Sequence, residues 1–148
     1  MTPSWLHKAA LLAVIAFSPL SMNAACADTA PALTPSAPNA KVYFIEPANG
    51  AVVGETFKVK FGLAGMGVAP AGTDKENTGH HHLLIDAASM PAMDKPLGQE
   101  VKHFGGGQTE TEVTLPKGTH TLQIIFADKS HIPHNPPVVS EKITVTVK

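Results

Sequence analysis

The amino-acid sequence predicts an all-β protein, a single immunoglobulin-like antiparallel β-sandwich that follows a cleaved signal peptide. Three observations support this prediction. Short segments within residues 41–148 alternate apolar and polar side chains with a period of two, as strands with one buried face do. Gly and Pro supply 20 of these 108 residues, which is typical of a chain with many turns. No segment shows the 3.6-residue periodicity of an amphipathic helix.

Residues 1–27 are predicted to be a signal peptide. Lys8 precedes the apolar stretch Ala9–Phe17, and residues 25–27 (ACA) supply the small-x-small pattern of a cleavage site. The apolar stretch is too short to span a bilayer, and no later segment predicts a transmembrane helix. The alternative is lipoprotein processing, in which Cys26 carries a lipid anchor. We therefore expect a periplasmic or secreted protein or, in the alternative, an outer-membrane lipoprotein.

Residues 28–40 are predicted to form an Ala/Pro-rich linker. The segment DTAPALTPSAPNA contains three prolines, and Leu33 is its only large apolar residue. Such a segment cannot bury enough apolar surface to fold by itself. The expected folded unit is therefore residues 41–148, a length that suits one domain.

The predicted strands follow the alternation along the chain. A short strand at residues 42–45 ends at the turn sequence Pro47–Gly50, and residues 57–63 alternate Phe, Val, Phe and Leu with Lys and Gly. Further strands are predicted at residues 82–86, 109–115, 119–127 and 143–147, with a turn at 116–118. Two long connections, residues 65–79 and 87–107, flank the histidines. Because long loops in compact domains are often functional, we expect the functional surface at one end of the sandwich.

Composition excludes several classes of function. The formal net charge is −1 and the chain has no Arg, so it lacks the basic surface that binds nucleic acid. The one cysteine, Cys26, lies in the predicted signal peptide, so neither a disulfide framework nor a zinc finger is expected. There is no G-x-S-x-G motif, and Gly105–Gly107 does not precede a helix as a phosphate-binding loop would. The sequence therefore predicts a protein that is not an enzyme.

Seven of the eight histidines follow residue 27, and three of them are consecutive. Because alternate side chains of a strand point to opposite faces, His80 and His82 are expected on one face and His81 on the other. The two leucines and the isoleucine that follow place apolar side chains on both faces of the strand. The alternation of side chains along the strand (the parity of the residue numbers) therefore leaves open which face is the core. A pair of histidines two residues apart on one strand can present two imidazoles to one metal ion.

The other histidines lie near glycines, prolines or a strand end. His103 stands before three glycines, which permit a sharp turn or a close approach. His131 and His134 are expected in a loop at residues 128–137, which two X-Pro pairs stiffen because proline restricts the residue before it. Asp128 in the same segment is expected to cap a turn. His120 shares the parity of the inward-facing residues of its strand and is expected to be a rim or core histidine.

Imidazole-rich sites suit copper and zinc, and the chain after residue 27 offers no thiol. Met90 and Met93 are further candidate donors, with a thioether softness that suits Cu(I). The prediction is an exported accessory or carrier protein that binds a copper or zinc ion. Two alternatives stay open: a structural or protein-interaction module of the cell envelope with structural histidines, and a small metalloenzyme. The predicted metal ligands are His80, His81, His82, His103, His131 and His134.

Three stretches of the chain, residues 65–86, 103–134 and 136–147, resemble an uncharacterised family of exported bacterial domains, the domain of unknown function 4399. This resemblance implies a compact exported module and carries no activity. The chain is also similar, over less of its length, to periplasmic copper-binding β-sandwich proteins of the copper-resistance type. That similarity rests on an early strand followed by residues 47–51, and on a late Asp with His nearby. Lys41 stands where those proteins have a histidine ligand, so no copper site is carried over.

Overall fold

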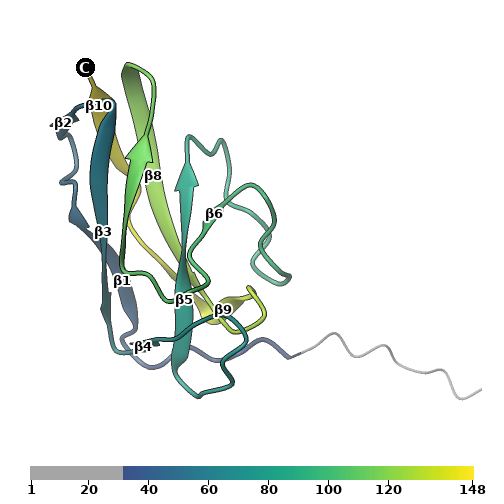
Figure 1. Cartoon of the computed structure of the whole chain (residues 1–148). Coiled ribbons are helices and arrows are strands. Elements are labelled where there is room, and N and C mark those ends of the chain that lie inside the picture. Colours follow the sequence, from purple (N-terminus) through teal and green to yellow (C-terminus); the bar gives the residue numbers. More distant parts are fainter. Residues whose placement is uncertain (1–31) are drawn as a thin grey trace, which may run out of the picture. The chain divides into compact units, whose positions relative to one another are not determined.

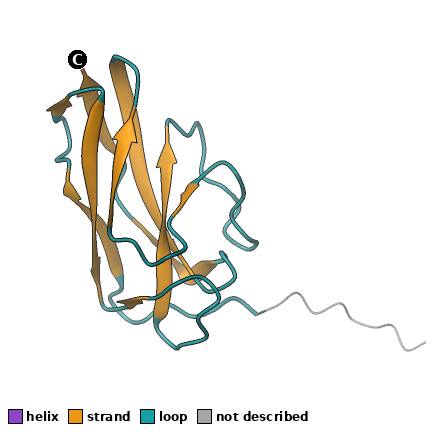
Figure 2. Cartoon of the chain, in the orientation of Figure 1, coloured by secondary structure: helices purple, strands orange, loops and turns teal. Residues whose placement is uncertain are grey.

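The computed structural model describes residues 32–148, which form two packed β-sheets without a helix (Figures 1 and 2). The all-β prediction is confirmed. Within these residues no helix has the length and apolar character needed to cross a membrane. The predicted signal peptide, residues 1–27, and residues 28–31 of the predicted linker lie outside the described residues.

The smaller sheet has three antiparallel strands in the order β1-β3-β7. The larger sheet has the order β2-β10-β8-β5-β4, with β6 also paired to β5 and β9 to β8. The orders β1-β3-β7 and β10-β8-β5 correspond to the A-B-E and G-F-C orders of immunoglobulin-like sandwiches. The strands are β1 (Lys41–Glu46), β2 (Val52–Val53), β3 (Thr56–Ala64), β4 (Gly67–Val68), β5 (Thr78–Ile85), β6 (Lys102–His103), β7 (Glu110–Thr114), β8 (Gly118–Ala127), β9 (Pro133–Val139) and β10 (Ile143–Val147).

The main core lies between the two sheets. Val59 and Phe61 of β3 pack there with Leu122 and Phe126 of β8, and each is at most 4% exposed. The period-two pattern that predicted these strands therefore marks their inward faces correctly. In β8, Ile125 points the other way, into a second cluster on the outer face of the larger sheet. The larger sheet is therefore covered on both faces in this region.

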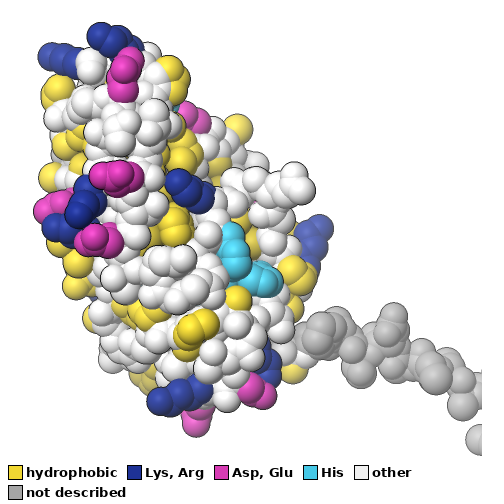
Figure 3. Space-filling model, viewed as in Figure 1, with side chains coloured by type: hydrophobic (Ala, Val, Ile, Leu, Met, Phe, Trp, Pro, Cys, Tyr) yellow, Lys and Arg dark blue, Asp and Glu magenta, His cyan; other side chains and the backbone are white. Residues whose placement is uncertain are grey.

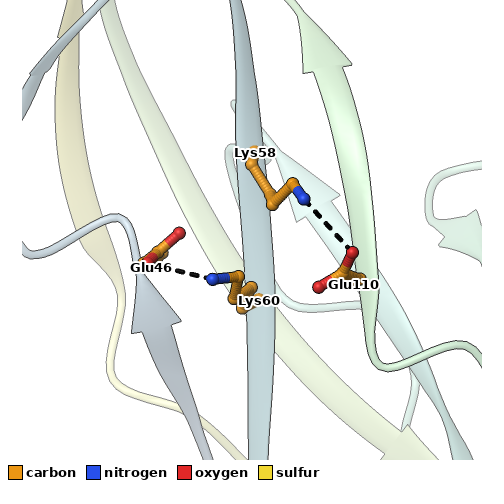
Figure 4. A network of polar contacts seen from close by, with 4 residues as sticks. All are labelled: Glu46, Lys58, Lys60 and Glu110. Carbon is orange, nitrogen blue, oxygen red and sulfur yellow. Dashed lines mark hydrogen bonds and ion pairs between the residues drawn. The ribbon is translucent and has the colours of Figure 1, made fainter.

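The outer face of the smaller sheet is polar. Lys58 lies 3.3 Å from Glu110, and Lys60 lies 3.2 Å from Glu46, in cross-strand ion pairs (Figure 4). These side chains are well exposed, and ion pairs of this kind contribute little to stability. The glutamates of β7 thus belong to a solvated face, and the histidine-rich part of the chain lies on the other sheet.

Strand β9 differs from the prediction, which places a stiff loop at residues 128–137. The structure confines the loop to residues before Pro133 and pairs Pro133, Val138 and Val139 with β8, with a register shift between them. Because β9 is an edge strand, its prolines leave no ladder hydrogen bond unmade inside the sheet. The short strands β2, β4 and β6 have only two residues each, too few to show a period.

Residues 34–36 of the predicted linker are attached to the sandwich. The backbone N–H of Asn135 donates to the carbonyl of Thr34 (2.9 Å), and the N–H of Ser36 donates to the carbonyl of Asn135 (3.1 Å). The Thr34 hydroxyl also donates to Oδ2 of Asp128 at 2.6 Å. The folded unit therefore starts earlier than Lys41, because the edge of β9 supplies partners for backbone groups that a free linker leaves to water.

We expect Leu122→Ala to lower the free energy of unfolding by about 2–5 kcal/mol, because Leu122 is fully buried and the variant leaves a cavity. Val52→Ala is the control: Val52 is 61% exposed, and its truncation should change the free energy by less than about 0.5 kcal/mol. Urea unfolding followed by circular dichroism measures both. Equal effects of the two substitutions would contradict the assigned core.

Candidate metal centre

Strand β5 places its three consecutive histidines on two faces. The His81 ring lies between the sheets, stacked on Phe61 with ring centroids 4.9 Å apart. His80 and His82 lie on the outer face, with ring centroids 4.6 Å apart. All three side chains are at most 1% exposed. The structure thus settles what parity leaves open: the face with His81 is the sandwich core, and the outer face is buried as well.

His103 reaches the pair on β5 through strand pairing. β6 lies antiparallel to β5 with His103 opposite His82, and Nε2 of His103 is 3.1 Å from Nε2 of His80. The first of the three glycines, Gly105, makes room for this ring, because a Cβ at Gly105 would overlap the His103 imidazole. The triple glycine is therefore a close approach of the kind the sequence allows, and Gly105 is a positioning residue that sequence analysis does not single out.

His131 comes from the tight loop between β8 and β9, where its φ is +65°. The Asp128 carboxylate holds this loop, since its Oδ1 accepts from the N–H groups of Ser130 (2.8 Å) and Ile132 (3.0 Å). The carbonyl of Asp128 accepts from the N–H of His131 at 3.0 Å. The predicted turn-capping role of Asp128 is confirmed, and its effect is to hold Nδ1 of His131 at 3.0 Å from Nε2 of His80.

Four imidazoles form the four-histidine cluster: His80, His82, His103 and His131. One ring nitrogen of each lies within 4.8 Å of one nitrogen of every other member. Around a tetrahedral ion with bonds of about 2.0–2.1 Å, neighbouring donors are roughly 3.3–3.4 Å apart. Small movements of the rings would therefore bring all four nitrogens to ligating distance. His80 and His82 form the buried side, whereas His103 is exposed and His131 partly so, and histidine reaches the surface in Figure 3.

Several nitrogens of the cluster have no hydrogen-bond partner. Both ring nitrogens of His82 and Nδ1 of His80 are buried and unpartnered. Nε2 of His80 faces nitrogens of both His103 and His131, and one proton cannot satisfy three nitrogens. A buried unpaired polar group costs about 1–3 kcal/mol. A cation that accepts one lone pair from each ring would offset this cost.

Burial favours the neutral form of three of these rings, His80, His82 and His103. Desolvation lowers the pKa of His82 to about 3 and that of His80 to about 4, and the neighbouring imidazoles act in the same direction. The pKa of His103 is lowered too, first by burial and then by the charge of His131. Because imidazole must be deprotonated to bind a metal, the lowered pKa values favour the ligating form of His80, His82 and His103 at neutral pH.

Two of the six predicted ligands lie outside the cluster. His81 is in the core, with Nδ1 3.3 Å from the carbonyl oxygen of Gln108. His134 belongs to β9, where it is buried with its ring stacked on Phe126, and its nitrogens lie 3.4 Å and 3.3 Å from the carbonyl oxygens of Phe126 and Thr78. The structure therefore does not bring them together with the other four, because β5 turns His81 inward and the loop that carries His131 ends before His134.

His120, which the sequence predicts as a rim or core histidine, is 9% exposed and has a different environment. Its Nδ1 donates to Oδ2 of Asp86 at 2.6 Å, and its Nε2 donates to the carbonyl of Pro116 at 2.8 Å. Both neighbours are acceptors, so the ring fits as an imidazolium that donates twice. The hydrogen bond to Asp86 accordingly raises the pKa of His120. This histidine ties two loops together and is not a candidate ligand.

Fold and cluster together define a class of protein: an immunoglobulin-like β-sandwich with four histidines on the outer face of one sheet. Residues 59–148 match the domain of unknown function 4399, and the chain belongs to this family. All four histidines of the cluster lie within the matched residues. The resemblance of the sequence motifs to this family is thereby confirmed.

Two solved structures are similar to the chain. One is the endo-β-1,4-mannanase from Thermotoga petrophila, with 16% identity, a TM-score of 0.45, and coverage of 75% of this chain and 20% of the mannanase. The chain thus spans one fifth of that protein. The other comprises the fibronectin(III)-like modules of Clostridium thermocellum CbhA, with 15% identity, a TM-score of 0.38, and coverage of 72% of this chain and 92% of the chain of those modules. No curated protein matches the chain at a significant level.

Metal-free protein should lose stability on acidification. The pKa values of His80, His81 and His82 lie at about 4, 4 and 3 in the folded chain, below the usual 6.5, so the unfolded chain binds more protons in this range. The free energy of unfolding should therefore be highest above pH 6.5 and decrease as the pH falls toward 4. The raised pKa of His120 acts in the opposite direction, but it is a single group, whereas the pKa values of these three histidines and of His103 are all lowered.

Urea unfolding of chelator-treated protein at several pH values between 7.5 and 4.5 measures this dependence. His81→Phe removes one of the three groups and should make the dependence shallower. A free energy of unfolding that stays constant from pH 7 to pH 5 would contradict the burial of these histidines as neutral rings.

Proposed function

We propose that the protein binds one copper or zinc ion at the four-histidine cluster and is an exported accessory or carrier protein without enzymatic activity. One observation carries the proposal: a ring nitrogen of buried His80 and one of buried His82, whose two nitrogens have no hydrogen-bond partner, lie within 4.8 Å of nitrogens of His103 and His131. Export is proposed from the signal peptide predicted at residues 1–27.

The donor set supports copper or zinc among the common metals. All four donors are neutral nitrogens, whereas Mg²⁺ and Ca²⁺ take oxygen ligands. Copper and zinc are the metals that imidazole-rich sites suit. The two methionines that the sequence offers as softer donors do not support a preference for Cu(I), because Met93 packs against the second apolar cluster and Met90 lines a different cavity.

The surroundings of the cluster support a carrier more than an enzyme. The walls beside the exposed histidines are Leu97, Gly98 and Val101, which offer no side chain that acts as a general base or nucleophile. His103 and His131 reach solvent, so an ion can enter and leave from one side without unfolding of the buried pair. A site that is buried on one side and accessible on the other suits reversible loading.

The alternative of a structural or interaction module has support from other histidines. His81, His120 and His134 each make hydrogen bonds to protein groups, as structural histidines do. That reading predicts a folded protein that takes up no metal and a binding partner recovered whether or not metal is present. The metalloenzyme alternative predicts turnover that follows the metal content.

Purified protein should bind about one Cu(II) or Zn(II) per chain, and His131→Ala should weaken binding at least about a hundredfold, because it removes a ligand. His134→Ala is the matched control: it removes a nearby histidine that lies outside the cluster and should change affinity less than about threefold. Isothermal titration and metal analysis measure both, with circular dichroism to verify folding. A folded protein that takes up no metal, or equal losses in the two variants, would contradict the proposal.

Gly105→Ala should weaken metal binding by about ten- to a hundredfold with little loss of stability. Its new methyl group displaces the His103 ring, which is the mobile end of an exposed side chain. Gly106→Ala is the control, because the atoms nearest to a Cβ there belong to the side chain of Gln108 and not to a histidine of the cluster. Neither glycine has a positive φ, so alanine fits both backbones. If the two variants bind metal equally well, His103 is not a ligand.

A further inference from the structure

A small cavity opens directly over the four-histidine cluster. Its volume is about 200 Å³, and three of the four candidate ligands line it together with three residues of the loop before β6. The lining residues are His82, Leu97, Gly98, Val101, His103 and His131. Apart from the histidines, these residues contribute no polar side chain. The cavity therefore adds space beside the metal position without adding a protein ligand.

The wall opposite the histidines is held in place. The backbone N–H of Leu97 donates to the carbonyl of His131 at 3.0 Å, which ties this wall to the loop that carries a candidate ligand. Val101 is 8% exposed and packs with Leu84 and Ile125 in the second apolar cluster. The cavity is thus bounded by anchored residues and is part of the folded site.

The charge of a bound metal ion determines which kind of ligand this cavity can hold. A divalent ion held by four neutral imidazoles keeps its full charge of +2, and no carboxylate of the described residues belongs to the cluster. Asp128 is near enough for its charge to act on His80, but both of its oxygens are engaged: Oδ2 by Thr34, and Oδ1 by the N–H groups of Ser130 and Ile132. These hydrogen bonds leave the Asp128 carboxylate its single negative charge, so at least one of the ion's two positive charges stays uncompensated. Such a charge in a partly buried site attracts a counter-ion strongly.

We propose that the metal-loaded cluster binds one small inorganic anion in this cavity, directly on the metal. The inference rests on the proposed metal binding. A water molecule takes about 30 Å³ of liquid volume, so the cavity has room for an anion of three or four heavy atoms. It is smaller than the roughly 300–1,000 Å³ of pockets that hold larger organic ligands. The ligand class is therefore a small inorganic anion and not an organic cofactor.

The test uses azide as the probe and Cu(II)-loaded protein, followed by visible absorption and electron paramagnetic resonance. We expect a saturable azide-to-copper charge-transfer band, one azide per copper, and an altered copper spectrum with the metal retained. A folded protein that takes up no Cu(II) would overturn the proposed function and this inference together. A copper spectrum that millimolar azide leaves unchanged, or azide that removes the copper, would overturn the inference and leave metal binding intact.

Substitutions at Leu97 locate the anion. Leu97→Phe narrows the cavity and should weaken azide binding at least about tenfold while Cu(II) uptake is unchanged, a loss that corresponds to about 1.4 kcal/mol. Leu115→Phe is the matched control, because Leu115 is also a half-buried leucine but packs against the main core. Leu97→Ala, which widens the cavity, should bind azide and also the larger thiocyanate. Equal azide affinity in Leu97→Phe and the unaltered protein would overturn the assignment to this cavity.

Discussion

The structure depends on one constraint: strand β5 is buried on both faces and carries three consecutive histidines there. On the inner face His81 joins the sandwich core beside Phe61. On the outer face His80 and His82 are covered by the residues that precede and form β6 and by the β8–β9 loop. Burial holds the rings of His80 and His82 neutral and leaves Nδ1 of His80 and both nitrogens of His82 without hydrogen-bond partners. The pairing of β6 and the capped β8–β9 loop add two further imidazoles, each with a nitrogen within 4.8 Å of a nitrogen of His80 and of His82.

Environment divides the histidines of this chain into different roles. His120 lies between a carboxylate and a carbonyl, so it is stabilised as a cation. Burial and the neighbouring imidazoles destabilise the cation of His82, whose two ring nitrogens have no hydrogen-bond partner. The same side chain thus serves as a charged tie between loops in one place and as a neutral donor in another. In the proposed function, the metal supplies the positive charge that the buried rings cannot carry, and the adjacent cavity admits the anion that compensates it.

The sequence predicts most of the fold because the alternation of apolar and polar residues is a local pattern. The longer strands of the core show this alternation, but β9 does not. The prolines of β9 are tolerated because it is an edge strand, and the sequence alone does not reveal that position. The site is less predictable. Parity pairs His80 with His82, but both faces of β5 are apolar, so parity cannot exclude His81. His103 arrives through pairing across a long loop, and the end of the β8–β9 loop separates His131 from His134. The positions of these histidines depend on tertiary contacts, which no local sequence pattern reports.

The central claim is that four imidazoles, and no other side chain, bind one metal ion. X-ray absorption spectroscopy of the zinc-loaded protein tests it most directly, because the fine structure reports the number and kind of ligands. We expect four imidazole nitrogens at about 2.0–2.1 Å, at most one further light-atom ligand, and no sulfur. A spectrum dominated by oxygen ligands, or one that shows two or fewer imidazoles, would contradict a four-histidine metal site.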